Sequence, residues 1–342
     1  MHACDVVIVG GGPAGSTCAW KLKEAGIDCL ILDSQDFPRN KLCAGWVTPA
    51  VFCDLEMDPA EYPYGLVTLR KIHVELFGKK SIHRWTLRTR QYSIRRWEFD
   101  HWLLLRSGAR FERHKVSSIR KEGSGYMVDD RYRCRYLVGA GGTGCPVGRT
   151  FFPELFPPPR EFQVAALEEE FFYPSRDESC RLWFGENGLA GYSWFVPKGN
   201  GWLNVGLGAI AGHPQNGESS LREHWGHFTR KLTDLGLVPG HDFNPGGYTY
   251  YLRRPGVAAH RDRCFLVGDS AGVATRNLGE GIGPAVISGL LTARAIATGR
   301  AYSLEGISRY SRLSTGLVTR MFEGLLYRSR DLLRVWGPSG AS

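Results

Sequence analysis

Residues 5–15 read Asp5-Val6-Val7-Ile8-Val9-Gly10-Gly11-Gly12-Pro13-Ala14-Gly15, an apolar run that stops at three consecutive glycines. The β-branched residues of this run predict a buried parallel strand. A helical stretch follows at 14–25, and a second apolar run at 27–32 stops at Asp33. Strand, glycine turn, helix and strand within about 30 residues form one βαβ unit. The sequence therefore predicts an α/β fold with a Rossmann-type nucleotide-binding domain.

The spacing Gly10-x-Gly12-x-x-Gly15 is typical of a dinucleotide site. The first glycine permits the tight turn, the second lets the backbone approach a pyrophosphate, and the third allows the helix to pack closely on the strand. The free N–H groups at the start of the helix favour phosphate. Asp33 lies 23 residues after Gly10 and is followed by Ser34, so its carboxylate is placed to accept hydrogen bonds from ribose hydroxyls.

Two later apolar runs, 136–140 and 264–269, predict further strands of the same sheet. The second run ends at Gly268-Asp269, and a glycine-lined helix start follows at 279–283. Ligands of open α/β sheets bind outside the carboxyl ends of the strands. A carboxylate there suits the ribityl chain of a flavin, and a helix N-terminus favours a ring that becomes negative on reduction. A helix cap is the alternative reading of Asp269.

The middle of the chain predicts a second layer. Aromatic-rich runs separated by turn residues predict an antiparallel sheet at 162–173, 180–185, 192–196 and 202–209, with a helix at 221–235. We expect this interleaved layer to cover the cofactor and form the substrate pocket. The predicted nucleotide-binding domain comprises 1–75, 95–160 and 255–300. The predicted substrate domain comprises 76–94 and 161–254, and a C-terminal helical segment comprises 301–342.

Composition narrows the class of protein. The formal charge of +9 comes without a Lys/Arg run of the kind that binds nucleic acid, so we expect no nucleic-acid partner. The nine cysteines show neither a CxxC pair nor regular spacing, which argues against a zinc site or a disulfide scaffold and favours the cytoplasm. We expect no bound metal. No run reaches the ~18 apolar residues of a membrane span.

Four segments together resemble the geranylgeranyl reductase/FixC-like branch of the FAD-dependent para-hydroxybenzoate hydroxylase superfamily. They are the glycine turn, Phe37–Gly45 (FPRNKLCAG), Arg96-x-x-Phe99-Asp100-x-x-Leu103, and the stretch from Gly268-Asp269 to Gly281-Ile282. A fifth, Gly191–Lys198 (GYSWFVPK), resembles the aromatic-Pro-Lys strand of that branch.

The resemblance implies roles for individual residues. Arg39 and Lys41 would lie along the FAD, Arg96 would reach its phosphate or ribityl region, and residues 43–45 would pass the isoalloxazine ring. The residues expected to bind FAD are Gly10, Gly12, Pro13, Ala14, Gly15, Asp33, Ser34, Arg39, Lys41, Cys43, Ala44, Gly45, Arg96, Gly141, Gly268, Asp269, Gly279, Gly281 and Ile282. In prenyl reductases of the branch a cysteine at the place of Cys43 is thought to assist reduction; a small buried hydrophobe is the alternative.

One departure concerns the electron donor. The family usually has Gly-Ala-Asp-Gly where this chain reads Gly139-Ala140-Gly141-Gly142. That aspartate helps to order the flavin and the nicotinamide cofactor, so its replacement by Gly141 puts fast reduction by NADH or NADPH in doubt. The chain has a single Rossmann fingerprint, and a reduced nicotinamide nucleotide would have to dock transiently. A separate electron-donor protein is the alternative.

The expected reaction is reduction of C=C bonds in a hydrophobic, isoprenoid or lipid-like substrate by hydride from reduced flavin. The catalytic candidates are Cys43, Tyr192 and Trp194, and Phe195 and Trp202 are further candidates for the pocket wall; the core of the antiparallel sheet is the alternative for these aromatics. A flavin monooxygenase of an aromatic substrate, a flavin halogenase and a non-catalytic flavin-binding protein remain open.

The C-terminal segment has helical spacing. Apolar residues at 322, 325, 326, 332, 333 and 336 interleave with arginines at 320, 328, 330 and 334. Such a helix can lie on an anionic membrane surface or pack on its own protein. The sequence therefore suggests a cytoplasmic protein with peripheral contact to the inner face of the membrane as one option.

Overall fold

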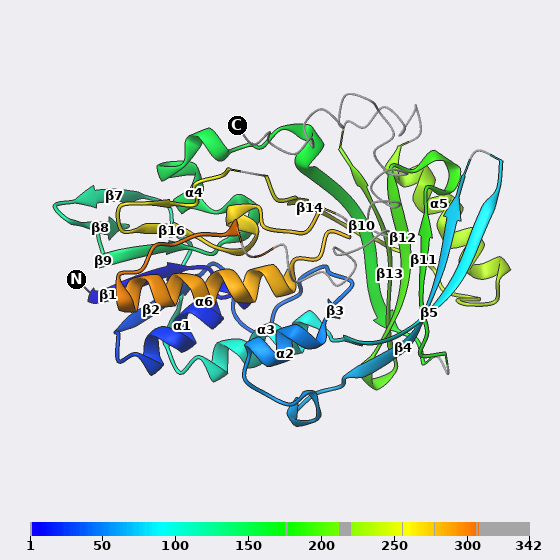
Figure 1. Cartoon of the computed structure of the whole chain (residues 1–342), viewed down its shortest axis with the longest axis horizontal. Coiled ribbons are helices and arrows are strands. Elements are labelled where there is room, and N and C mark those ends of the chain that lie inside the picture. The colour runs from blue at the N-terminus through cyan, green and yellow to red at the C-terminus, as the bar shows by residue number, and fades with distance from the viewer. Residues whose placement is uncertain are drawn as a thin grey trace, which may run out of the picture.

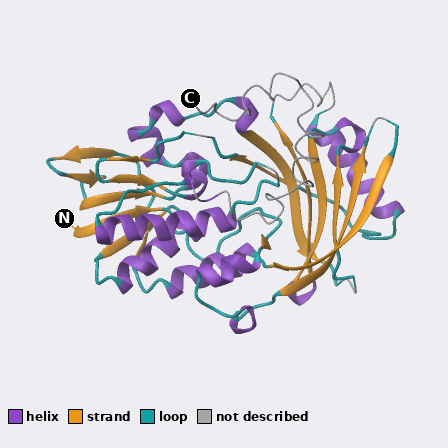
Figure 2. Cartoon of the chain, viewed as in Figure 1, coloured by secondary structure: helices purple, strands orange, loops and turns teal. Residues whose placement is uncertain are grey.

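The structure is a computed structural model that describes residues 2–78, 80–174, 177–211, 220–254, 256–276, 278–305 and 307. Two β-sheets lie side by side, with most helices beside the first sheet (Figures 1 and 2). The α-helices are α1 (Pro13–Glu24), α2 (Pro49–Asp54), α3 (Arg96–Arg106), α4 (Pro146–Phe151), α5 (Leu221–Asp234) and α6 (Ile282–Thr298).

The first sheet is the predicted Rossmann sheet. Its strands are β1 (His2–Val9), β2 (Cys29–Asp33), β6 (Arg110–Arg113), β7 (Ile119–Glu122), β8 (Gly125–Val128), β9 (Tyr132–Gly139), β15 (His260–Arg261) and β16 (Cys264–Leu266). The order is β15-β16-β9-β1-β2-β6, and β16, β9, β1, β2 and β6 are parallel. The predicted fold class and βαβ unit are confirmed. The last strand is shorter than predicted, because the backbone turns at Gly268, where φ is +58°.

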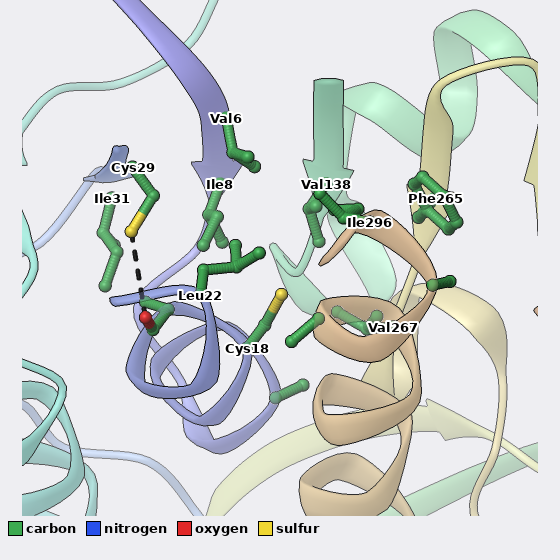
Figure 3. Packing of buried hydrophobic residues seen from close by; sticks show 14 of the residues in the cluster. Val6, Ile8, Cys18, Leu22, Cys29, Ile31, Val138, Phe265, Val267 and Ile296 are labelled. Carbon is green, nitrogen blue, oxygen red and sulfur yellow. Dashed lines mark hydrogen bonds between the residues drawn. The ribbon is translucent and has the colours of Figure 1, made fainter. Parts of the chain in front are cut away.

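Helices α1 and α6 pack together against one face of this sheet. Val6 and Ile8 point from β1 into the contact, and Cys18 and Leu22 meet them from α1 (Figure 3). All four are fully buried. A glycine at 289 in α6 lets the helices approach, because a Cβ there would lie 2.4 Å from the Ala14 carbonyl oxygen. This packing fixes the start of both helices at the carboxyl ends of the strands.

The second sheet is the predicted antiparallel layer. Its strands are β3 (Trp46–Val47), β4 (Val67–Phe77), β5 (Ile82–Ser93), β10 (Gln163–Phe172), β11 (Cys180–Phe184), β12 (Gly191–Lys198), β13 (Trp202–Ile210) and β14 (Gly246–Tyr251). The order is β14-β10-β13-β12-β11-β4-β5-β3, and only the β11–β4 pair is parallel. The sheet starts earlier in the chain than predicted, because β3 and residues 67–75 of β4 belong to it rather than to the first layer.

Strand alternation gives the second sheet two different faces. Leu167 and Phe195 pack on the side that α5 covers. Ala166, Glu168 and Trp194 face the first sheet and line a cavity. The predicted helix at 221–235 is α5, and its capping box at Ser220 and Glu223 fixes its start.

Within the described residues, no helix is long and apolar enough to cross a membrane. The predicted amphipathic C-terminal helix falls on residues from 308 onward, which lie outside the described part of the chain.

Candidate functional site

A cavity of ≈ 500 Å³ lies between the two sheets. Its wall includes almost all of the residues predicted to bind the cofactor: Gly10, Gly12, Pro13, Ala14, Asp33, Ser34, Arg39, Lys41, Cys43, Ala44, Gly45, Arg96, Gly141, Gly268, Asp269, Gly279, Gly281 and Ile282. Gly15 lies just behind this wall, in the first turn of α1. The predicted meeting of three strand ends is therefore observed, although the individual roles stay predictions.

The glycine turn brings backbone atoms close together at one end of the cavity. Gly10 has φ +114°, and a Cβ there would lie 2.3 Å from the Ala140 carbonyl oxygen. A Cβ at Gly15 would lie 2.0 Å from the Gly10 carbonyl oxygen. Helix α1 begins after Gly12 with Pro13, and no side chain caps it. Its first N–H groups are therefore available to an anionic ligand.

Asp33 stands beside that turn at the end of β2. Its Oδ2 accepts a hydrogen bond from the Gly11 N–H at 2.8 Å, and its Oδ1 accepts one from the Gln35 N–H at 3.0 Å. These bonds fix the carboxylate. Each oxygen keeps a further lone pair, which suits the two hydroxyls of a ribose.

A second open helix start lies farther along the cavity. No side chain caps α6 at Gly281. Gly279 has φ +65°, and a Cβ there would lie 2.2 Å from the Tyr250 hydroxyl. The Tyr248 hydroxyl donates to Asp269 Oδ2 at 3.0 Å. Tyr248 and Tyr250 also line the cavity. Neither tyrosine is among the site residues predicted from the sequence, although the alternation of side chains along β14 places both on one face of the strand.

Two arginines of the cavity contact one buried carboxylate, that of Asp100. Arg96 binds Asp100 with two hydrogen bonds of 2.5 and 2.7 Å, and Arg39 lies 3.3 Å from the same carboxylate. Burial alone would lower the pKa of Arg96, but Asp100 outweighs burial and raises it. Two arginines against one aspartate leave a net positive charge beside the cavity. That charge favours a phosphate-bearing ligand.

Lys41 stands between the cofactor segments and the second sheet. Its Nζ lies 2.9 Å from the centroid of the Tyr248 ring. Burial lowers the pKa of Lys41 to about 8, although Asp269 partly offsets this effect. Lys41 therefore stays mostly a cation at neutral pH but loses its proton at a lower pH than an exposed lysine.

The segment 43–45 is held from both sheets. The Lys198 ammonium donates to the Cys43 carbonyl at 3.0 Å, and the Gly45 N–H donates to the Cys43 sulfur at 3.3 Å. Gly45 has φ +66°, and a Cβ there would lie 2.0 Å from the Ile94 carbonyl oxygen. The Cys43 side chain is half-buried and lines the cavity.

The aromatic candidates lie on different faces of the second sheet. Tyr192 and Trp194 line the cavity. The Tyr192 hydroxyl donates to the Leu278 carbonyl, and burial raises its pKa well above the usual range. The Trp194 indole N–H donates to the Asn204 side chain at 2.7 Å. These two side chains therefore form a wall whose polar atoms already have partners.

Phe195 and Trp202 do not form this wall, which corrects the prediction for both. Phe195 points to the α5 side of β12 and is fully buried there. Trp202 lies under the Arg95 guanidinium at 3.5 Å from its ring centroid. Strand alternation explains the first case, because neighbouring residues of a strand point to opposite faces.

The sequence also missed Glu168. This carboxyl lines the cavity and is 3% exposed. It is the first of three consecutive glutamates, and in the sequence alone such a charged run indicates a solvent-exposed segment. No group of three or more potential metal ligands occurs among the described residues.

Comparison with known proteins agrees with the geometry. A family model described as FAD dependent oxidoreductase matches residues 5–105. An uncharacterized protein of Methanosarcina barkeri is 32% identical, over 87% of this chain and 76% of its own length. A protein of Methanopyrus kandleri named digeranylgeranylglycerophospholipid reductase 1 is 29% identical, over 83% of this chain and 78% of its own length.

Among solved structures, a geranylgeranyl bacteriochlorophyll reductase-like protein of Thermoplasma acidophilum has the same fold. The TM-score is 0.75 at 20% identity, and the match covers 98% of this chain and 86% of that protein. The donor set of the cavity fits FAD: an open helix start beside Asp33 suits the adenosine diphosphate half, and a second open helix start beside Asp269 suits the flavin half.

Proposed function

The chain belongs to the FAD-dependent oxidoreductases, in the geranylgeranyl reductase-like branch, and from this premise we propose that it reduces C=C bonds of an isoprenoid or other lipid-like substrate. The observation that carries the proposal is the character of the wall opposite the cofactor segments. Ala166, Leu182, Tyr192, Trp194 and Val196 present an apolar surface there. Such a surface suits a hydrocarbon chain.

The residues of the chain would divide the work between the two sheets. The starts of α1 and α6, with Asp33 and Asp269, would hold FAD. Reduced FAD supplies the hydride when bound. The wall of the second sheet would orient the substrate and exclude water, since Tyr192 and Trp194 are already satisfied by protein partners. Cys43 would lie beside the reacting groups, because it lines the cavity and a hydrogen bond from Lys198 holds its segment in place.

The electron donor belongs to the same proposal. We propose that NADH or NADPH docks transiently beside the flavin or that a separate protein delivers the electrons. Gly141 supports the second route, because it offers no carboxylate where the family usually has one. The cytoplasmic face of a membrane would be the natural place to meet a lipid substrate. Its support is the basic, apolar C-terminal sequence alone.

The test is anaerobic turnover with defined reagents. Purified protein loaded with FAD and reduced with dithionite is mixed with a phospholipid that carries geranylgeranyl chains. We expect flavin oxidation and a product heavier by two hydrogen atoms for each double bond. The fully saturated lipid is the matched control and should leave the flavin reduced. Substrate-stimulated oxygen uptake with a hydroxylated product, and no saturation, would favour a monooxygenase instead.

A further inference from the structure

Glu168 is a carboxylic acid held inside the cavity. It lies in the middle of β10, opposite Gly206 of β13 and Gly246 of β14. A Cβ at Gly206 would lie 2.6 Å from the Glu168 Cβ, so the missing side chain there makes room for the acid. The Glu168 Oε2 is buried and has no hydrogen-bond partner in the part of the chain that the structure describes. The cavity is the space that this residue lines.

The polar and charged side chains near Glu168 interact mainly with other residues. Lys198 of β12, whose side chain is fully buried, pairs with Glu170 at 2.7 Å and donates to the Cys43 carbonyl. Lys41 rests on the ring of Tyr248, the next inward-facing residue of β14. The neutral side chain of Asn204 of β13 accepts from Trp194 through its oxygen, while its amide favours the charged form of Glu168. The acid therefore has cations near it but no ion pair of its own.

This setting keeps the acid protonated to a higher pH than usual. Burial raises the pKa of Glu168 to about 7, against the opposing effects of Lys198, Asn204 and Lys41 and with a small addition from Glu170. At neutral pH a large fraction of the molecules therefore carries a carboxyl O–H at this place. A pKa near the working pH is the property that a general acid needs.

We propose that Glu168 is a catalytic residue, the proton donor for reduction of the substrate double bond. The inference rests on the proposed function. One alkene carbon receives the hydride from reduced flavin and the other receives the proton from the Glu168 O–H. The π bond breaks, two C–H bonds form, and the substrate gains the two electrons that the flavin loses. Glu168 is left as a carboxylate, which water reprotonates.

The other acidic side chains of the wall fit this role less well. The Tyr192 O–H is already donated to the Leu278 carbonyl, and its pKa is raised far above neutral. The Tyr248 O–H is donated to Asp269 in the same way. Glu170, on the same face of β10 but outside the cavity wall, is held ionised by Lys198 and Arg95. Lys41 also lines the cavity with a lowered pKa of about 8, but at neutral pH it is mostly a cation over the Tyr248 ring. Among the carboxylic and phenolic side chains compared, Glu168 combines a buried position on the cavity with a transferable proton near neutral pH.

The experiment compares wild type, Glu168→Gln and Glu168→Asp. FAD-loaded enzyme is reduced with dithionite, and a single turnover of the geranylgeranyl phospholipid is followed from about pH 5 to 9. We expect the wild-type rate to fall above about pH 7. Glu168→Gln should be slower by roughly 10²–10⁴-fold and lose this pH dependence, and Glu168→Asp should recover part of the rate.

Two readouts do not depend on turnover. The infrared band of a protonated carboxyl should titrate near pH 7 in wild type and be absent in Glu168→Gln. FAD content and reduction by dithionite should be the same in both proteins. Glu169→Gln is the matched control, because Glu169 points to the other face and pairs with His241 at 3.0 Å. It should keep the wild-type rate profile.

The outcomes separate the two proposals. If wild type saturates no prenyl chain, the proposed function and the role of Glu168 fall together. If wild type is active and Glu168→Gln keeps its rate and pH profile, only the role of Glu168 is overturned. A carboxyl band that shows no titration near pH 7 overturns it as well.

Discussion

Replacing Glu168 with glutamine should change how the stability of the protein depends on pH. The variant should gain free energy of unfolding relative to wild type as the pH rises from about 4.5 to about 7, because the pKa of the acid moves from 4.5 to about 7 on folding. Below this window both the folded and the unfolded chain keep the proton, so burial of a charge costs nothing. Above it the folded wild type must hold a buried carboxylate, which glutamine avoids.

The magnitude follows from the two pKa values. A difference of one pKa unit corresponds to about 1.4 kcal/mol, so a move from 4.5 to about 7 corresponds to about 3 kcal/mol. This is a large part of a total stability of about 5–15 kcal/mol. The relative gain should grow through the window and level off above the folded pKa.

The assay is denaturant unfolding of both proteins at several pH values, at one FAD concentration, since bound ligand adds to stability. The change of the difference with pH is the quantity of interest, because any constant effect of the amide cancels. Glu170→Gln serves as a control of opposite sign. Burial would raise the pKa of Glu170, but Lys198 and Arg95 more than offset it and the pKa is lowered.

The stabilising effect of Glu170 is therefore present above a pH of about 4.5 and is lost as the pH falls through its folded pKa. Glu170→Gln should have a lower free energy of unfolding than wild type at neutral pH, and this difference should shrink as the pH falls. Parallel curves for wild type and Glu168→Gln between about pH 5 and 8 would refute the reasoning about Glu168.

Three further predictions concern the cofactor side and the link between the sheets. Gly15→Ala should weaken FAD binding by at least about tenfold, because its Cβ would lie 2.0 Å from a backbone oxygen of the glycine turn. Gly226→Ala in α5, which meets nothing within 4 Å and lies outside the cavity, should bind FAD normally in the same fluorescence titration. Asp33→Ala should raise the Kd for FAD by about tenfold or more, since hydrogen bonds to charged groups contribute about 1.5–3 kcal/mol, and an unchanged Kd would contradict its role. Lys198→Met should lower the free energy of unfolding by about 1.5–3 kcal/mol by removing one of the two cations that bind Glu170, the other being Arg95, and adding Glu170→Gln should recover part of the loss in chemical denaturation.

The cofactor half of the site was predictable because local rules dictate it. A glycine that must adopt φ +114° and a glycine that must let a helix touch a strand leave a fixed spacing in the sequence. The β4–β5 hairpin was harder to see, because much of β5 is exposed and carries arginines at 84, 88 and 90 among its apolar residues. Such a strand has no clean alternation to read.

The substrate half of the site depends on how the strands pair, which the amino-acid sequence does not show directly. Residues 168–170 are three glutamates in a row, yet they meet three different environments. Glu169 turns toward His241 on one face, and Glu170 pairs with Lys198 on the other. Glu168 shares the face of Glu170 but sits opposite two glycines, over which Trp194 and Leu42 pack, so no charged side chain opposite it forms an ion pair with it.

This contrast explains why the second sheet, rather than the Rossmann sheet, would carry the acid. Two carboxyls two residues apart on one strand have pKa values displaced in opposite directions, Glu168 upward and Glu170 downward. Pairs of this kind mark a division into a proton donor and a fixed charge. Lys198 joins the pair to the Cys43 carbonyl, so the ionised member also fixes the segment that passes the flavin. Loss of Glu170 should therefore disturb flavin position and lower stability at neutral pH, whereas Glu168→Gln should slow proton delivery and, above about pH 7, raise the free energy of unfolding.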